Sequence, residues 1–301
     1  MAGFKAGYVA ILGRPNVGKS TLVNALLGQK VAAVSPRPQT TRRNQLGILN
    51  SPDSQIVFID TPGLHEKRNK LGELMNQEAL FALEDADVLL FLVDAADAPG
   101  NEDSNLAEAL AKRKRKQPVL LILNKIDLID TQMRRGRRTQ YDAVAQAGQT
   151  LEISALNGQG LPELLTQILS LLPEGLAFFP PDQVTDLWER QIAADLIREA
   201  ALQRLRDEVP HGIAVRVENF TERGEKGALI EATLYVERDS HKGIVVGEGG
   251  KMIKLIGQAA RKEIEAMSGR KVFLDLRVKV KENWRDDENQ LEKFGYARNA
   301  D

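Results

Sequence analysis

Short apolar runs alternate with amphipathic segments along the first 175 residues of the chain. Residues 88–93 and 119–123 are apolar at consecutive positions, without the period of two that a half-exposed strand shows. This pattern is typical of strands that helices cover on both faces. We expect strands at 8–12, 55–59, 88–93, 118–123 and 150–153, and helices from residue 19 and around 70–83, 103–113, 137–147 and 161–171. Together these segments predict an α/β domain with a doubly wound, mostly parallel sheet.

The pattern changes beyond a proline-rich break. The stretches LPEG at 172–175 and FPP at 179–181 cannot continue a helix, so we place a boundary near Pro180, between a domain at 1–179 and a second at 180–301. In the second domain we expect helices at 185–206 and 252–267, strands at 214–220, 228–238 and 272–281, and a short helix within 282–296. Trp188 is expected to pack its helix into the second core. The mixture predicts an α+β domain.

Composition narrows the class of protein. A chain of 301 residues with 43% hydrophobic content can bury two cores, and the absence of cysteine excludes disulfides, a thiol nucleophile and Cys-ligated metals. The first residues lead directly into a strand pattern, and the longest apolar runs fall far short of the roughly 20 residues that span a bilayer. We therefore expect a cytoplasmic protein.

Four short motifs occur in the order of a guanine-nucleotide pocket: GRPNVGKS at 13–20, DTPG at 60–63, NKID at 124–127 and SAL at 154–156. A phosphate-loop string arises by accident in about one chain in a hundred of this length, and an ordered NKxD makes accident a poor explanation. The motifs predict a P-loop NTPase domain. The expected nucleotide-binding residues are Gly13, Arg14, Pro15, Asn16, Val17, Gly18, Lys19, Ser20, Thr21, Asp60, Thr61, Pro62, Gly63, Asn124, Lys125, Asp127, Ser154, Ala155 and Leu156.

The first two motifs carry the chemistry of phosphates and Mg²⁺. Glycines let backbone N–H groups surround the phosphates, and the helix that follows adds its partial positive charge. Lys19 would reach the β- and γ-phosphates, and the hydroxyl of Ser20 would bind Mg²⁺. Asp60, at the end of a strand, would bind the metal through water, and Gly63 would offer its N–H to the γ-phosphate.

The third motif predicts the base. The carboxylate of Asp127 can accept hydrogen bonds from N1–H and the exocyclic amine of guanine, a donor pair that adenine lacks, so GTP is favoured over ATP. The backbone at Ser154 and Ala155 could meet the guanine O6.

A loop at 38–43, PQTTRR, lies between the first two motifs and should respond to the nucleotide. We expect Thr41, with Thr40 as the alternative, to bind Mg²⁺ when GTP is present. Leu64 follows DTPG, where many small GTPases orient water with glutamine, so catalysis must be arranged differently. Asn16 either holds a monovalent cation or caps its turn. The candidate catalytic residues are Asn16, Lys19, Thr41 and Gly63.

The second domain contains the segment IVVGEGGKMIK at 244–254. Its Gly-rich backbone would let a sugar–phosphate chain come close, and the helix N-terminus with Lys251 and Lys254 would attract it. Residues 238–285 hold 12 Lys or Arg against 6 Asp or Glu, which indicates a surface that faces phosphate. The expected RNA-binding residues are Gly247, Glu248, Gly249, Gly250, Lys251 and Lys254.

Taken together, these motifs resemble the Era branch of the translation-factor-related GTPases, over essentially the whole chain. The resemblance implies a GTPase domain followed by a type II KH domain whose GxxG loop runs from Gly247 to Gly250. It also implies slow hydrolysis of GTP to GDP assisted by K⁺ at Asn16, and binding near the 3′ end of 16S rRNA in small (30S) ribosomal subunit assembly. Peripheral membrane association is reported for the family, and nothing in the chain demands a dimer.

Other interpretations remain open. A tRNA-modification GTPase is disfavoured because the chain lacks cysteine and a helical insertion, and a tandem-domain GTPase is excluded by the single phosphate loop. A non-enzymatic RNA-binding scaffold with a structural nucleotide is the alternative that Leu64 supports. Two basic runs, at 112–116 and 134–138, indicate either a solvated face or a docking surface.

Overall fold

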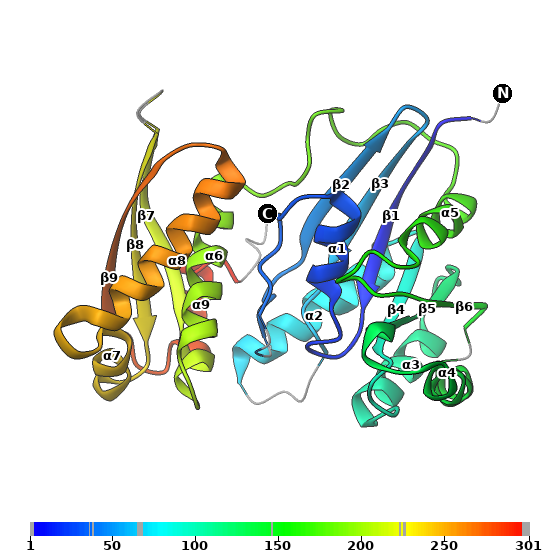
Figure 1. The fold of residues 1–301 in the computed structure, drawn as a ribbon, viewed down its shortest axis with the longest axis horizontal. Coiled ribbons are helices and arrows are strands. Elements are labelled where there is room, and N and C mark those ends of the chain that lie inside the picture. Colours follow the sequence, from blue (N-terminus) through cyan, green and yellow to red (C-terminus); the bar gives the residue numbers. More distant parts are fainter. Residues whose placement is uncertain are drawn as a thin grey trace. The chain divides into compact units, whose positions relative to one another are not determined.

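The computed structural model describes residues 3–35, 37, 39–64, 69–145, 147–222, 224 and 227–296. The chain forms two compact units (Figure 1). The first consists of the described residues of 1–32, 41–66 and 75–186, and the second of those of 33–40, 67–74 and 187–301. The boundary near Pro180 stays a prediction. Pro38 of the expected nucleotide-responsive loop and residues 65–68 after DTPG lie outside the described residues.

The first unit is built on a six-stranded sheet in the order β2-β3-β1-β4-β5-β6. Its strands are β1 (Lys5–Leu12), β2 (Gln45–Ser51), β3 (Ser54–Asp60), β4 (Val88–Asp94), β5 (Val119–Asn124) and β6 (Gln149–Glu152). All neighbours pair in parallel except β2 and β3, which form an antiparallel hairpin. The mostly parallel sheet is confirmed, whereas β2 was missed. Its sequence QLGILNS lacks an apolar run. It also contains Gly47, where a Cβ would lie only 2.8 Å from the Val23 side chain, so there is no space for a larger residue.

Helices cover both faces of this sheet (Figure 1). They are α1 (Lys19–Leu27) and α5 (Leu161–Leu171) on one face, and α2 (Lys70–Asp85), α3 (Asn101–Lys112) and α4 (Thr131–Ala145) on the other. Leu22 and Leu164 pack with Ile11 on the first face, and Leu110 and Tyr141 pack with Phe91 on the second. Because β1, β4 and β5 run in parallel and β3 runs parallel to β1, their carboxyl ends meet at one edge, where open α/β sheets bind ligands.

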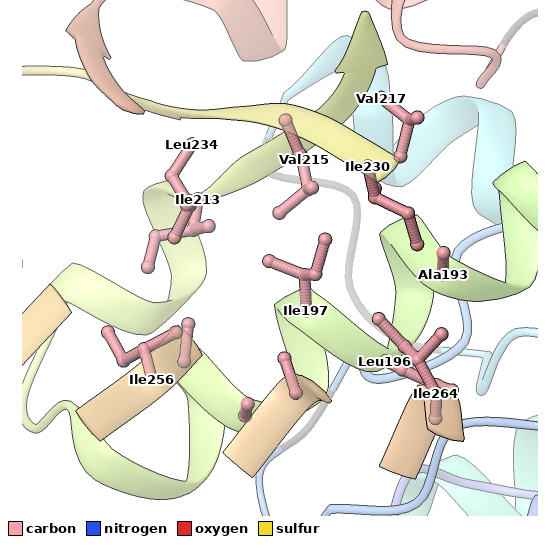
Figure 2. Packing of buried hydrophobic residues seen from close by; sticks show 14 of the residues in the cluster. Ala193, Leu196, Ile197, Ile213, Val215, Val217, Ile230, Leu234, Ile256 and Ile264 are labelled. Carbon is pink, nitrogen blue, oxygen red and sulfur yellow. The ribbon is translucent and has the colours of Figure 1, made fainter. Parts of the chain in front are cut away.

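The second unit has a three-stranded sheet in the order β7-β8-β9. Its strands are β7 (Ala214–Glu222), β8 (Ala228–Val236) and β9 (Val272–Val280), and its longer helices are α6 (Glu189–Arg204), α7 (Asp239–Val246) and α8 (Lys251–Ser268). Strand β8 pairs antiparallel with β7 and parallel with β9. In Figure 2, Val215 and Ile230 of the sheet face Ile197 of α6 and Ile256 of α8 across one apolar core. The predicted α+β arrangement is confirmed.

The two tryptophans have opposite environments. Trp188 is 76% exposed, so the prediction that it packs into the second core was wrong. Its backbone is extended, at φ −68° and ψ 145°, so the side chain leaves the apolar stripe of α6 before the helix begins. Trp284 is fully buried instead, and its Nε1 donates to the Gly212 carbonyl at 2.9 Å. It lies between β9 and the short helix α9 (Glu288–Lys293) in sequence, and its ring contacts Phe294.

Candidate nucleotide and RNA sites

The phosphate loop connects β1 to α1, and its glycines are required by space. A Cβ on Gly13 would lie 2.3 Å from the Leu92 carbonyl oxygen of β4. Gly18 has φ +102°, and a Cβ there would lie 2.4 Å from Nδ2 of Asn124. Both positions therefore exclude a side chain, and Gly18 also needs the left-handed conformation that glycine adopts without strain.

Lys19 begins α1 and is buried beneath the loop. Its Nζ donates to the carbonyls of Gly13 and Arg14, each at 3.0 Å. Burial lowers the pKa of Lys19 to about 8, against the opposing effect of the Asp60 carboxylate. A buried ammonium group has lost its stabilising water. Negatively charged phosphate oxygens would therefore stabilise its charged form strongly.

Three oxygen-bearing side chains from distant parts of the chain converge beside Lys19. Ser20 Oγ lies 2.6 Å from Asp60 Oδ2 and 2.9 Å from Thr41 Oγ1, and Thr41 Oγ1 donates to Asp60 Oδ2 at 3.3 Å. Thr40 faces another way, since its hydroxyl donates to the Arg37 carbonyl at 2.8 Å. An all-oxygen set that contains a carboxylate suits Mg²⁺, and Thr41 is the threonine that contributes to it.

The DTPG segment lies directly against the phosphate loop. Thr61 Oγ1 donates to the Ile11 carbonyl at 2.7 Å, and a Cβ on Gly63 would lie 2.7 Å from the Pro15 nitrogen. Leu64 is half-buried and packs against the apolar core that α2, α3 and α4 cover. Its side chain is therefore part of the packing, and it carries no polar atom that could orient water.

The NKID segment ties the other motifs together. Asn124 Nδ2 donates to the Val17 carbonyl at 2.8 Å, and its Oδ1 accepts the N–H of Ala155 at 2.9 Å. Lys125 Nζ donates to the Asn16 carbonyl at 2.7 Å. The side chains of Asn124 and Lys125 thus fasten the phosphate loop, and Asn124 also fastens the loop at 154–156. Leu156 is exposed, and so is Asp127 in the short helical turn Ile126–Leu128.

Three aspartates support this loop and were missed in the sequence. Asp94 accepts from Lys125 Nζ at 2.6 Å, Asp97 pairs with Arg14 Nη2 at 2.5 Å, and Asp103 lies 3.7 Å from Arg14 Nε. The hydrogen bond from Arg14 lowers the pKa of Asp97, whereas burial raises the pKa of Asp103. The side chain of Arg14 therefore binds carboxylates of the protein itself. Asp94 is the last residue of β4, as Asp60 is the last residue of β3. An aspartate directly after an apolar run was therefore the feature of the sequence that could have identified Asp94.

The GxxG loop connects α7 to α8 in the second unit. A Cβ on Gly247 would lie 2.8 Å from the Met252 Cβ, while nothing lies within 4 Å of the Cβ positions of Gly249 and Gly250. Gly250, at φ +78°, directly precedes the first turn of α8. Lys251 Nζ lies 3.5 Å from Glu248 Oε2, and both side chains are exposed. The acidic residue of the loop therefore partly neutralises its own lysine.

A hollow of about 340 Å³ lies between α8 and the edge strand β9, and its lining begins at Ile253. Lys254 and Arg261 give the hollow positive charge. Gly257 leaves space on the surface of α8, because a Cβ at this position would lie 3.4 Å from Leu276 Cδ1. The residues that line it are Ile253, Lys254, Gly257, Gln258, Arg261, Leu274 and Leu276. Only Lys254 was expected from the sequence. The spacing of 254, 257, 258 and 261 along one helix face was the signal that could have identified the others.

The two basic runs are largely engaged within the first unit. Arg113 donates to the carbonyls of Leu110 and Gln117, and Arg115 pairs with Asp87 at 2.8 Å. In the second run Arg134 donates to the Ile126 carbonyl at 2.8 Å. These bonds favour an intramolecular role over a docking surface. Among the described residues, the helices are all too short or too polar to cross a membrane.

Known sequence families match both units. A family described as "50S ribosome-binding GTPase" matches residues 8–125, and one described as "KH domain" matches residues 208–285. A curated relative from Ruminiclostridium cellulolyticum, named GTPase Era, is 45% identical over 98% of this chain and 99% of its own length.

Solved structures match over the same span. A crystal structure of Era in complex with MgGDPNP and nucleotides 1506–1542 of 16S ribosomal RNA has a TM-score of 0.92 and 40% identity, over 98% of this chain and 100% of that one. A crystal structure of a single-residue variant of Aquifex aeolicus Era bound to GDP·AlF4⁻ has a TM-score of 0.93 and 39% identity, with the same coverage.

Proposed function

The chain belongs to the GTPase Era family, and from this premise we propose that it is a Mg²⁺-dependent, K⁺-assisted GTPase whose KH domain binds the 3′ end of 16S rRNA during small-subunit assembly. The observation that carries the nucleotide half is the convergence of Ser20, Thr41 and Asp60 beside the buried Lys19. The hollow behind the GxxG loop supports the RNA half. A cytoplasmic location, peripheral membrane association and a monomeric state remain predictions.

The proposed hydrolysis follows from the placement of these residues. Backbone N–H groups of the phosphate loop and the Lys19 ammonium hold the β- and γ-phosphates in line. Ser20, Thr41 and Asp60 would hold Mg²⁺ directly or through water, and the bound ion would supply positive charge that neutralises the phosphate oxygens. The Gly63 N–H donates to the γ-phosphate. The oxygen of a water molecule would then bond to the γ-phosphorus as the bond from this phosphorus to the bridging β-phosphate oxygen breaks. The proton that the water loses would pass to a phosphate oxygen or to solvent, which yields GDP and phosphate.

K⁺ assistance at Asn16 is the finer part of the proposal. Asn16 is exposed in the phosphate loop with φ +64°, so its side chain, which carries an amide oxygen that can bind a cation, lies at the surface of the loop. Leu64 supplies no polar group, and a cation at Asn16 would supply positive charge near the bond between the β- and γ-phosphates. Slow turnover in the absence of RNA is expected, because Leu64 occupies the position at which many small GTPases carry a water-orienting glutamine.

The RNA half of the proposal assigns different work to the loop and the hollow. The GxxG loop lets a sugar–phosphate backbone approach the N-terminus of α8. Lys254 and Arg261 attract the phosphates, and the apolar wall formed by Ile253, Leu274 and Leu276 receives unstacked bases.

The first experiment measures GTP turnover in KCl and in NaCl, with and without an oligonucleotide from the 3′ end of 16S rRNA. Stimulation by K⁺ and by RNA is expected, with the RNA effect lost in Lys251→Glu. Thr41→Ala and Thr40→Ala form a matched pair, of which only the first should abolish Mg²⁺-dependent turnover. Turnover at background in every condition would instead favour the non-enzymatic scaffold.

A second experiment tests the base. Asp127→Asn replaces an acceptor with a group that can donate, so the variant should lose affinity for GTP and gain affinity for XTP, whose base carries a carbonyl in place of the amine. If Asp127→Asn still prefers GTP to XTP, Asp127 does not recognise the guanine base.

A further inference from the structure

Helix α6 holds a segment that lies immediately before Thr41 in the chain. Glu199 Oε2 accepts the N–H of Val34 at 3.2 Å, near the beginning of the segment. At its end, Arg198 Nη1 donates to the Gln39 carbonyl at 3.0 Å and Nη2 donates to the Thr40 carbonyl. Residues 33–40 accordingly belong to the same compact unit as α6. The segment is held at both ends by neighbouring side chains of one helix.

Arg198 is unusual for the depth at which its charge is buried. Its side chain is 2% exposed, and its nearest carboxylate oxygen, Asp195 Oδ1, is 3.5 Å away. Its Nε has no hydrogen-bond partner among the described residues. A buried guanidinium group is tolerated only when acceptors replace water. Two of the acceptors here are the carbonyls of Gln39 and Thr40, so Arg198 and the segment depend on each other.

The Thr40 carbonyl belongs to the peptide bond that leads to Thr41, a residue of the candidate Mg²⁺ site. Thr41 follows Thr40 directly, and its hydroxyl lies 2.9 Å from Ser20 Oγ and 3.3 Å from Asp60 Oδ2. The Thr40 carbonyl and the Thr41 N–H belong to one planar peptide unit, so a displacement of the Thr41 backbone on loss of a metal contact would move the Thr40 carbonyl as well. Such a movement would change the hydrogen bonds that Arg198 makes to this segment.

Residues of α6 next to Arg198 and Glu199 pack against the helix that follows the GxxG loop. Leu196 and Ile197 share one apolar core with Ile256 and Ile264 of α8, as Figure 2 shows. Close-packed interiors transmit a shift of one helix to its neighbour, because they contain few voids that could absorb it. A change at Arg198 is thereby felt by α8, whose first residues carry the expected RNA contacts.

We propose that Arg198 is a positioning residue that places Thr41 for Mg²⁺·GTP and couples the nucleotide state to RNA binding at α8. The inference rests on the proposed function and adds the residue that connects its two halves. With GTP bound, Thr41 is held at the metal and the two carbonyls face Arg198. After hydrolysis Thr41 is released, and the guanidinium group must find other acceptors, which shifts α6 and α8. Linkage requires RNA to change affinity for a GTP analogue by the same factor as the analogue changes affinity for RNA.

The test uses the full chain and compares Arg198→Met, which keeps apolar bulk, with Arg198→Lys, which keeps the charge and one donor. Arg204→Met is the matched control, since Arg204 lies on the same helix and donates to the Ala200 carbonyl of that helix. For each protein, the affinity for a 16S rRNA 3′-end oligonucleotide is measured with Mg²⁺·GDPNP and with Mg²⁺·GDP. Single-turnover hydrolysis and thermal melting accompany these measurements.

The expected result is a loss of coupling with binding otherwise intact. In Arg198→Met the ratio of RNA affinities in the two nucleotide states falls to about one, and single-turnover hydrolysis slows about tenfold or more, because Thr41 is poorly placed. Affinity for GDP stays at the wild-type value, since GDP has no γ-phosphate to bring Thr41 to the metal. Arg198→Lys gives an intermediate ratio, and Arg204→Met matches the wild type.

Several outcomes would overturn the inference. A folded Arg198→Met with the wild-type ratio and rate would do so, and if that variant does not fold, a wild-type ratio and rate in Arg198→Lys would do the same. A wild-type chain that hydrolyses GTP and binds RNA with no dependence on nucleotide would refute the coupling and leave the proposed function standing. A wild-type chain that does neither would refute the proposed function itself.

Discussion

The two glycine-rich loops use the same elements, a glycine backbone and a helix N-terminus, in opposite surroundings. In the phosphate loop, Gly13 and Gly18 are enclosed so tightly that an added Cβ would overlap Leu92 or Asn124. In the GxxG loop, Gly249 and Gly250 have positive φ angles but open space around them. Glycine is required in the first loop by contact with other parts of the chain, and at these two positions of the second by local backbone conformation.

This difference matches the two ligands. A small polyanion is bound best by groups that are held in place before it arrives, and Asn124, Lys125 and the buried Lys19 hold the phosphate loop in that way. A single-stranded polymer has many conformations, and an open loop, followed on the same helix by a hollow, can accept its backbone without a rigid cage.

Gly18→Ala should have the largest effect of the changes that test this comparison. The new Cβ would displace Asn124, and the left-handed backbone would be strained, so we expect about 2–3 kcal/mol less stability and a loss of GDP affinity of about 100-fold. Thermal melting and fluorescent-GDP titration measure both quantities. Gly136→Ala, in the open interior of α4, is the control and should stabilise the chain slightly. Wild-type GDP affinity in Gly18→Ala would show that the loop is not preorganised as described.

Lys254→Glu should weaken RNA binding about tenfold at low salt and flatten its salt dependence, because it reverses a charge in the hollow. GDP affinity should not change. Lys262→Glu makes the same charge change on α8 outside the lining of the hollow and should have a much smaller effect. Equal losses in the two variants would mean that only the net charge of the domain matters. Filter binding over a salt series separates these results.

Gly249→Ala is the counterpart of Gly18→Ala in the open loop. Its φ of +58° disfavours a side chain, but no atom lies within 4 Å of the new Cβ. We expect a folded protein with unchanged GDP affinity and a loss of RNA affinity of about threefold to tenfold, which corresponds to the cost of the left-handed conformation. A loss as large as that of Gly18→Ala, measured as a ratio to wild type, would contradict the contrast between the two loops.

Glu248→Gln should give the smallest effect, and its sign is opposite. Removing the carboxylate frees Lys251 from its 3.5 Å partner and removes repulsion toward phosphate, so RNA affinity should rise about twofold to threefold at low salt. The gain should vanish at high salt, since both groups are exposed. A decrease in affinity would instead indicate that the carboxylate itself contacts RNA.

The sequence by itself determined the elements whose information is local. Continuous apolar runs predicted the four central strands of the first sheet, and the phosphate-binding and base-binding motifs were read directly from residues 13–20, 60–63 and 124–127. The strand predictions are confirmed, and all of these inferences can be made from sequence because period, turn chemistry and motif spacing are properties of short segments. Strand β2 could not be predicted in this way, because it is stabilised by pairing with β3 and by packing against α1, and neither is a property of its own short segment.

Only the tertiary structure decided which distant side chains meet. It separated Thr41, beside Ser20 and Asp60, from Thr40, and it exposed Trp188 while burying Trp284. It paired Arg14 with Asp97 and brought Arg198 to the backbone of residues 39 and 40. The contacts of Thr41, Trp284, Arg14 and Arg198 join residues far apart in the chain, where periodicity carries no information. The outcome depends on which buried polar groups can satisfy one another once both cores have packed.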